Sequence, residues 1–261
     1  MNNFFKRSLS ALFLLSLFIF AFFSPEKNIF LFLTSIISLI ALYELSNLLE
    51  LSNIKLFYFW ILPIISYFLF IYEYYNFDLI IYLSSFFWIF IAIFSVIKAK
   101  ILFKFIDFLY GIIIIFGLFI STIYLFSFDK SLLLISLSIV WISDIFAYFS
   151  GKFFGKKKLA FNISPGKTIE GVYGAFIANL IFILVLSIFF DFSFVLLTLL
   201  SLIIIPLSIF GDLFESQLKR NANTKDSGSL LPGHGGILDR LDGLCSTLPI
   251  VASLSLFGFV I

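Results

Sequence analysis

The sequence predicts an all-α, polytopic integral membrane protein with about nine transmembrane helices. The first observation is its composition: of 261 residues, 62% are hydrophobic and only 12% are charged. A soluble domain is about half apolar and about one quarter charged, and its core could not bury this much apolar surface. The second observation is that the apolar residues form runs of about 20, the length that crosses a bilayer as a helix. The third is that basic residues concentrate in alternate connections between these runs.

Charges and turn residues separate nine candidate spans. They lie at residues 8–24, 29–49, 56–75, 77–97, 106–128, 131–150, 171–190, 193–214 and 243–261. The first span follows Lys6 and Arg7, so a cleaved signal peptide is the alternative interpretation. Its apolar run is long, and no small-x-small cleavage site precedes Ser24 and Pro25, so we expect the helix to be retained.

The basic residues predict the orientation of these spans. The N-terminal segment and the loops after even-numbered spans hold 15 of the 17 basic residues, whereas the other loops hold only Lys27 and Lys130. Because basic residues favour the cytoplasmic side, the N-terminus and the long polar segments 151–170 and 215–242 are expected in the cytoplasm.

The chain reads as one membrane-embedded domain, 1–261, without an internal repeat. Residues 1–140 predict a helical scaffold with candidate dimer contacts, and residues 141–261 contain most of the polar chemistry. The net charge of +2 is too small to indicate a nucleic-acid-binding protein. The single cysteine, Cys245, excludes an internal disulfide and a cysteine-based zinc site.

Five acidic residues lie close to the predicted cytoplasmic face. Asp144 is in the sixth span, Asp212 and Glu215 end the eighth, and Asp239 and Asp242 open the ninth. Ionisable groups at membrane depth are costly, and they mark functional sites by default. Residues three apart on a helix share a face, so Asp239 and Asp242 are expected to point the same way.

The helix dipole accounts for only part of this acidic group. An acid at a helix start is favourable, which could explain Asp239 alone. Asp212 and Glu215 are expected at a helix C-terminal end, where the dipole disfavours anions. Carboxylates in such a place predict a divalent cation held between helices, and oxygen ligands fit Mg²⁺.

The two polar segments supply groups that suit a polyphosphate. Lys167 and Lys219 are candidates for phosphate contacts, and a glycine-rich run occupies residues 232–236. The lysines of 156–158 are better explained as an anchor for topology or lipid headgroups. Residues 164–168 resemble the end of a Walker A loop, but Phe161 stands where that motif requires glycine, so a P-loop is excluded.

His234 is the only histidine of the chain, and it lies between glycines in the second polar segment. A general-base role and a role as hydrogen-bond donor to a phosphate or to an acidic neighbour are both compatible with this position.

The second polar segment resembles the signature of phosphatidate cytidylyltransferases over the 27 residues 216–242. The matching residues are mostly polar or glycine: Ser216, Lys219, Arg220, Lys225, Asp226, Pro232, Gly233, His234, Gly235, Gly236, Asp239, Arg240 and Asp242. An upstream block resembles the same family through Asp144, Ala147, Tyr148, Gly151, Gly155, Lys158, Leu159, Ser164, Pro165, Gly166, Lys167, Thr168, Glu170 and Gly171. Ile169 replaces a frequent Trp and Gly243 a frequent Ser, which leaves details of the substrate pocket open.

The resemblance implies a membrane nucleotidyltransferase that converts CTP and phosphatidate to CDP-diacylglycerol and pyrophosphate. It implies dependence on Mg²⁺, with a second cation left open, a homodimer, and a multi-pass location in a bacterial inner membrane. It places metal binding at Asp212, Asp239 and Asp242. The catalytic group adds Lys219 and His234 to these acids. The substrate-binding group comprises Asp144, Ser164, Lys167, Thr168, Glu170, Ser216, Arg220, Lys225, Asp226, Gly235, Gly236 and Arg240.

Two other functions compete with this interpretation. An ion-coupled transporter also uses carboxylates in the membrane, but it predicts a site near the midplane between two related halves, and the acids here lie near one face. A CDP-alcohol phosphotransferase would gather its aspartates on two adjacent helical stretches, whereas these acids are distributed over three spans. Release of pyrophosphate rather than CMP would distinguish the last two functions.

Overall fold

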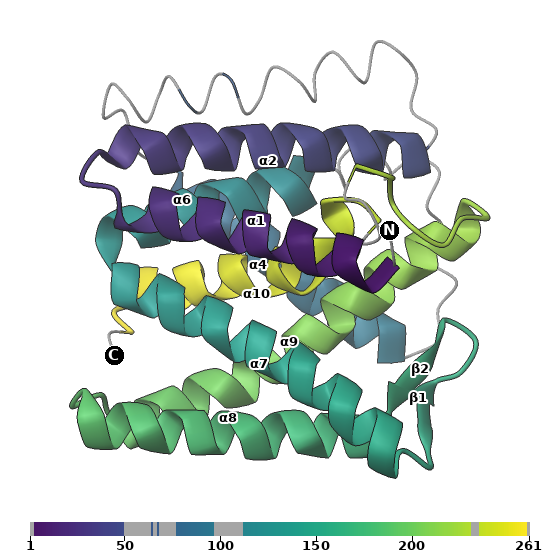
Figure 1. The fold of residues 1–261 in the computed structure, drawn as a ribbon. Helices are drawn as coiled ribbons and strands as arrows, with labels where there is room; N and C mark the ends of the chain where they lie inside the picture. The colour runs from purple at the N-terminus through teal and green to yellow at the C-terminus, as the bar shows by residue number, and fades with distance from the viewer. Residues whose placement is uncertain are drawn as a thin grey trace.

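A computed structural model describes residues 3–49, 64, 67, 77–96, 112–230 and 235–259 of the chain. Within these ranges the protein forms eight α-helices, one short π-helical segment and one hairpin of two strands (Figure 1). In chain order they are α1 (Asn3–Phe23), α2 (Lys27–Leu48), α4 (Asp78–Val96), the π-helical η1 (Ile112–Phe116), α6 (Gly117–Phe128), α7 (Lys130–Phe154), β1 (Lys158–Ala160), β2 (Ser164–Thr168), α8 (Ile169–Phe189), α9 (Phe194–Asn221) and α10 (Leu238–Leu256).

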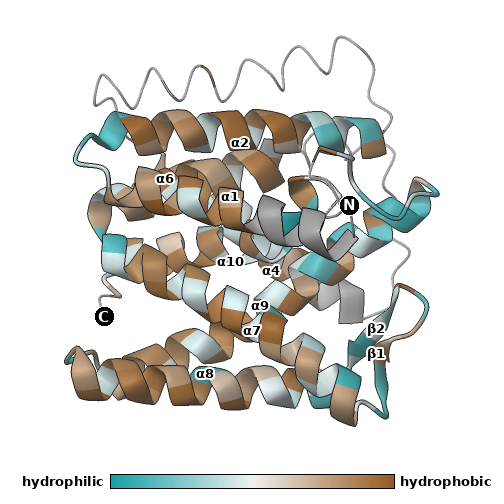
Figure 2. Cartoon of the chain, in the orientation of Figure 1, coloured by the Kyte–Doolittle hydropathy of each residue, from teal (hydrophilic) through white to brown (hydrophobic). Residues whose placement is uncertain are grey.

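The helices have the lengths and composition of membrane spans. Of the described helices, α2, α7, α8 and α9 are long and apolar enough to cross a bilayer, and α1, α4 and α6 contain shorter apolar stretches. Figure 2 shows hydrophobic residues along most of the helical surfaces. The predicted helical membrane protein is therefore confirmed. The number of nine spans stays a prediction, because most of the third span and the first residues of the fifth lie outside the described residues.

The structure corrects the sequence prediction at two places. The segment 151–170, predicted as a loop, contains a hairpin in which Lys158 pairs with Thr168 and Ala160 with Ser164, a small addition to the otherwise helical fold. Helix α9 continues to Asn221, so 215–221 are helical rather than part of a loop. The ion pair between Glu215 and Lys219, one turn apart, stabilises this extension. The dipole argument for Asp212 and Glu215 was therefore wrong, since its effect is confined to the last turn of a helix.

Polar side chains define the beginnings of three helices. The Asp129 carboxylate accepts hydrogen bonds from the N–H groups of Ser131 and Leu132 at the start of α7. Thr168 and Ser193 cap α8 and α9 in the same way. Each cap satisfies backbone donors that the helix itself leaves unpaired.

Helix α10 lies at the centre of the described helices and packs against α4, α6, α7 and α9. Its buried face includes Leu248, Val251 and Ala252. Close approach of α9 depends on Gly211, because a Cβ atom there would lie 2.4 Å from the Asp242 carbonyl oxygen and 2.4 Å from Ser246 Oγ. Because Gly211 has no side chain, α9 and α10 can pack closely where they carry their acidic residues.

The N-terminus and the described parts of the two long polar segments lie at one end of the helices. The N-terminus, the C-terminal ends of α2 and α9, and the hairpin lie toward the right in Figure 1, whereas the C-terminal end of the described chain lies at the opposite end. This is the grouping that the alternation of basic residues predicted. Which end faces the cytoplasm stays a prediction.

Candidate active site

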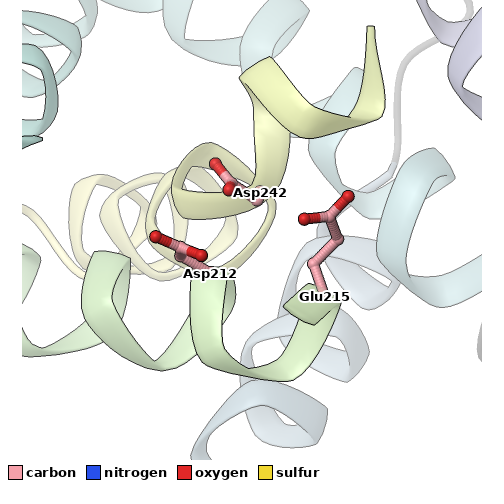
Figure 3. Close-up of side chains that lie close together, drawn as sticks. All are labelled: Asp212, Glu215 and Asp242. Atoms are coloured by element: carbon pink, nitrogen blue, oxygen red, sulfur yellow. The ribbon is translucent and has the colours of Figure 1, made fainter. Parts of the chain in front are cut away.

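Three carboxylates converge where α9 meets α10. Asp212 and Glu215 project from α9 and Asp242 from α10 (Figure 3). One carboxylate oxygen of each lies within 4.8 Å of those of the other two. Asp212 follows Gly211 directly, so the close helix contact places this acid beside the backbone of Asp242. We call Asp212, Glu215 and Asp242 the acidic cluster.

The chemistry of the acidic cluster fits a divalent cation. Glu215 is buried, and its Oε1 accepts no hydrogen bond from any described residue. A buried carboxylate oxygen without a partner is unfavourable, and a bound cation would compensate it. All the atoms that could bind a metal ion here are carboxylate oxygens, which are the ligands that Mg²⁺ prefers.

Lys219 connects the acidic cluster to Asp239. Its Nζ donates to Glu215 Oε2 and to Asp239 Oδ1, both at 2.6 Å. The other oxygen of Asp239, Oδ2, accepts the N–H groups of Gly236 at 2.7 Å and of Ser227 at 3.0 Å, and Ser227 Oγ at 3.0 Å. Asp239 is thus bound by protein donors on both oxygens. Its predicted role as a metal ligand stays a prediction, and Glu215 takes its place in the geometric cluster.

The hairpin brings a second lysine to the site. Lys167, on β2, lies with its Nζ 2.6 Å from Asp212 Oδ2. Two other predicted residues position this hairpin: Thr168 Oγ1 accepts the Gly171 N–H at 3.1 Å, and Glu170 Oε2 accepts the N–H groups of Lys156 at 3.0 Å and Lys157 at 3.2 Å. Through these contacts Thr168 and Glu170 hold the hairpin in place and thereby position Lys167.

A cavity of about 1020 Å³ joins this polar site to an apolar region. Its polar wall contains residues that the sequence had predicted: Asp144, Ser164, Lys167, Thr168, Asp212, Lys219, Asp226, Asp239, Arg240 and Asp242. Its apolar wall is formed by side chains of α1, α2, α6 and α7, among them Phe18, Phe30, Leu33, Phe119 and Trp141. The cavity thus suits a molecule with a charged head and a hydrocarbon portion.

The chain matches one protein family over almost its whole length. Residues 5–257 match the sequence profile of the Cytidylyltransferase family. The chain belongs to this family. The resemblance inferred from the motifs is thereby confirmed.

Three bacterial phosphatidate cytidylyltransferases are similar to parts of this family member. The protein of Staphylococcus saprophyticus is 49% identical over 122 residues, that of Pseudomonas aeruginosa 45% over 128, and that of Haemophilus influenzae 43% over 135. These alignments cover 46–48% of this chain and 46–47% of the relatives. The chain thus spans about half the length of the curated relatives it matches.

The other predicted residues that the structure describes do not line the cavity. Ser216 Oγ donates to Asp212 Oδ1 at 3.3 Å, and Arg220 Nη1 donates to the Thr224 carbonyl oxygen at 3.3 Å. Lys225 is exposed. Gly235 has a φ of 81°, a left-handed conformation that favours glycine. These residues, with Glu170 and Gly236, lie outside the cavity wall that the described residues form, and His234 lies outside the described residues.

Glu44 on α2 is a site-associated residue that sequence reasoning missed. Its side chain is buried and accepts the N–H groups of Ile237 at 3.1 Å and Leu238 at 2.8 Å, and Ser227 Oγ at 2.9 Å. From the sequence, residues 1–140 are expected to form only a helical scaffold with candidate dimer contacts. An acid within the apolar run of the second span was the available signal, because such a group requires partners.

Proposed function

We propose that this family member is a phosphatidate cytidylyltransferase, which makes CDP-diacylglycerol and pyrophosphate from CTP and phosphatidate in phospholipid biosynthesis. The cavity carries the proposal, because one wall holds acids and lysines and the other is apolar. The names of the similar bacterial proteins support the same reaction.

The cavity suits the two different substrates. Phosphatidate keeps its acyl chains in lipid while its phosphate reaches the polar wall, and CTP enters from water. A site for both has to lie at a membrane surface. We propose that this surface is the cytoplasmic face of a bacterial inner membrane and that the active protein is a homodimer.

The acidic cluster would hold Mg²⁺ through Asp212, Glu215 and Asp242. When bound, the cation would supply neutralisation of phosphate charge. Asp239 is oriented by Lys219, Gly236 and Ser227, and the sequence signature keeps it as a further candidate ligand.

The reaction that we propose is an in-line displacement. A phosphate oxygen of phosphatidate forms a new bond to the α-phosphorus of CTP, the bond to the bridging oxygen breaks, and pyrophosphate leaves with that electron pair. Such transfers depend mainly on positioning and electrostatic stabilisation. Lys167 and Lys219 are the lysines of the polar wall that would position the phosphates. Because phosphatidate is already anionic near neutral pH, the reaction needs no strong base, which makes a base role for His234 unnecessary.

Pyrophosphate release by the purified protein in detergent tests the proposal. We expect release only when CTP, phosphatidate and Mg²⁺ are all present. Asp242→Asn should lower the rate by about 100-fold or more, within the range for loss of electrostatic stabilisation in an active site. Asp191→Asn is the matched control, because Asp191 is exposed on the connection between α8 and α9. Release of CMP, or no release of pyrophosphate when CTP, phosphatidate and Mg²⁺ are all present, would contradict the proposal.

A further inference from the structure

We propose that Glu44 is a positioning residue for the reaction: through Ser227 and the first turn of α10 it fixes the placement of Asp239, Lys219 and the acidic cluster. This inference rests on the proposed function. It assigns a role in the reaction to α2, which belongs to the half of the chain otherwise interpreted as scaffold.

The Glu44 carboxylate joins two segments that are far from it in sequence. On one side it accepts Ser227 Oγ at 2.9 Å, and on the other it accepts the N–H groups of Ile237 at 3.1 Å and Leu238 at 2.8 Å. Leu238 is the first residue of α10, so one carboxylate holds both the segment after α9 and the start of α10.

The surroundings leave room for a carboxylate and for little else. A Cβ atom at Gly228 would lie 2.5 Å from Glu44 Oε1, and one at Gly236 would lie 2.2 Å from Glu44 Oε2. Both glycines therefore let the backbone approach the carboxylate closely. The negative charge also lies at the N-terminal end of α10, where the helix dipole favours it.

A continuous chain of polar contacts leads from Glu44 to the acidic cluster. Ser227 Oγ, which meets Glu44, also lies 3.0 Å from Asp239 Oδ2. Asp239 Oδ1 accepts Lys219 Nζ at 2.6 Å, and the same Nζ donates to Glu215 Oε2 at 2.6 Å. Every link joins groups that are buried or half-buried, where hydrogen bonds are strong and loss of a partner is costly.

The first turn of α10 determines where two of the acids point. Asp239 follows Leu238 directly, and Asp242 lies three residues further on the same helix face. A shift at Leu238 would therefore move both acids relative to α9. Displacements of about 1 Å at a reacting centre can lower rates by about 100-fold.

Glu44→Gln removes the negative charge and one acceptor oxygen while nearly keeping the size of the side chain. Each carboxylate oxygen faces a backbone N–H, so either orientation of the glutamine amide places its NH₂ group against a donor. Ser227→Ala removes the hydroxyl that joins Glu44 to Asp239 and leaves both backbone contacts of Glu44 and the contact of the Ser227 N–H to Asp239. Glu26→Gln is the matched control, because Glu26 is an exposed acid at the other end of α2.

The experiment measures kcat and KM for CTP per folded molecule, with thermal unfolding as the check on folding. We expect Glu44→Gln and Ser227→Ala each to lower kcat by about ten-fold, with KM changed less than about two-fold, since positioning acts on the transition state. The double variant should be little slower than the slower single variant, because residues in one network are not additive. Glu26→Gln should behave as the wild type.

Unchanged kcat in folded Glu44→Gln, or fully additive losses in the double variant, would overturn this inference and leave Glu44 as a packing residue. If Glu44→Gln does not fold, unchanged kcat in Ser227→Ala overturns it. A wild-type protein that releases no pyrophosphate overturns the proposed function instead, so the two failures are distinguishable.

Discussion

At the scale of single residues, Lys219 lies between two carboxylates that are almost fully removed from solvent. The side chains of Lys219, Glu215 and Asp239 are 12%, 4% and 7% exposed. Removing the Lys219 ammonium group would leave the carboxylates of Glu215 and Asp239 without their shared partner. Breaking a buried ion pair in this way costs about 3–5 kcal/mol, far more than the loss of a surface pair.

Replacement of Lys219 is therefore expected to affect stability as well as turnover. We expect Lys219→Met to lower the free energy of unfolding by about 3 kcal/mol, measured by denaturation in detergent. Lys225→Met, at an exposed position, should leave the unfolding free energy within about 0.5 kcal/mol of the wild type. Equal effects of the two substitutions would show that the ion pairs of Lys219 contribute little.

Cation affinity distinguishes the two acids that Lys219 joins. We expect Glu215→Gln to weaken Mg²⁺ binding by at least about ten-fold, because the unpartnered Oε1 is the group that a cation would compensate. Asp239→Asn should weaken it less, since protein donors already occupy both oxygens. Titration with Mn²⁺ followed by electron paramagnetic resonance measures this without turnover. The opposite order would favour the ligand set of the sequence signature.

At the scale of elements, the contact between α9 and α10 sets the geometry of the acidic cluster. Gly211→Ala would place a Cβ atom 2.4 Å from the Asp242 carbonyl oxygen, so the helices must separate. We expect weaker Mn²⁺ binding and at least about ten-fold lower turnover, since a displacement near 1 Å is enough to lower rates. Gly243→Ala is the milder comparison, because its nearest contacts would be 3.3 Å away. An equal or larger loss in Gly243→Ala would contradict this view of the contact.

The sequence predicted the described helices and most of the charged residues of the cavity wall, and its errors have physical causes. Asp212 and Asp242 were predicted together because polar groups in apolar runs are costly. The end of α9 was placed too early because charges at Glu215 and Lys219 resembled a loop, whereas they form a pair along the helix. Glu44 was missed because its partners lie 183–194 residues away. An acid within an apolar run indicates that partners are needed, but no local pattern identifies partners so far away in the sequence.

At the scale of the whole molecule, helix α8 separates the two ends of the protein. Its 21 residues extend about 30 Å, which matches the hydrocarbon thickness of a bilayer. The hairpin precedes this helix and the connection around Asp191 follows it. These two places should therefore lie on opposite sides of the membrane.

Cysteine labelling tests this topology directly, because the chain has only one cysteine, the buried Cys245. In a Cys245→Ala background, we expect an impermeant maleimide to label Asp191→Cys in right-side-out vesicles. Lys157→Cys, in the exposed segment before β1, should react only after the vesicles are permeabilised. The reverse pattern would overturn the cytoplasmic location of the active site, since CTP would then face the wrong compartment. Labelling of both positions from one side would contradict α8 as a span, and the division of the cavity between water and lipid would need another explanation.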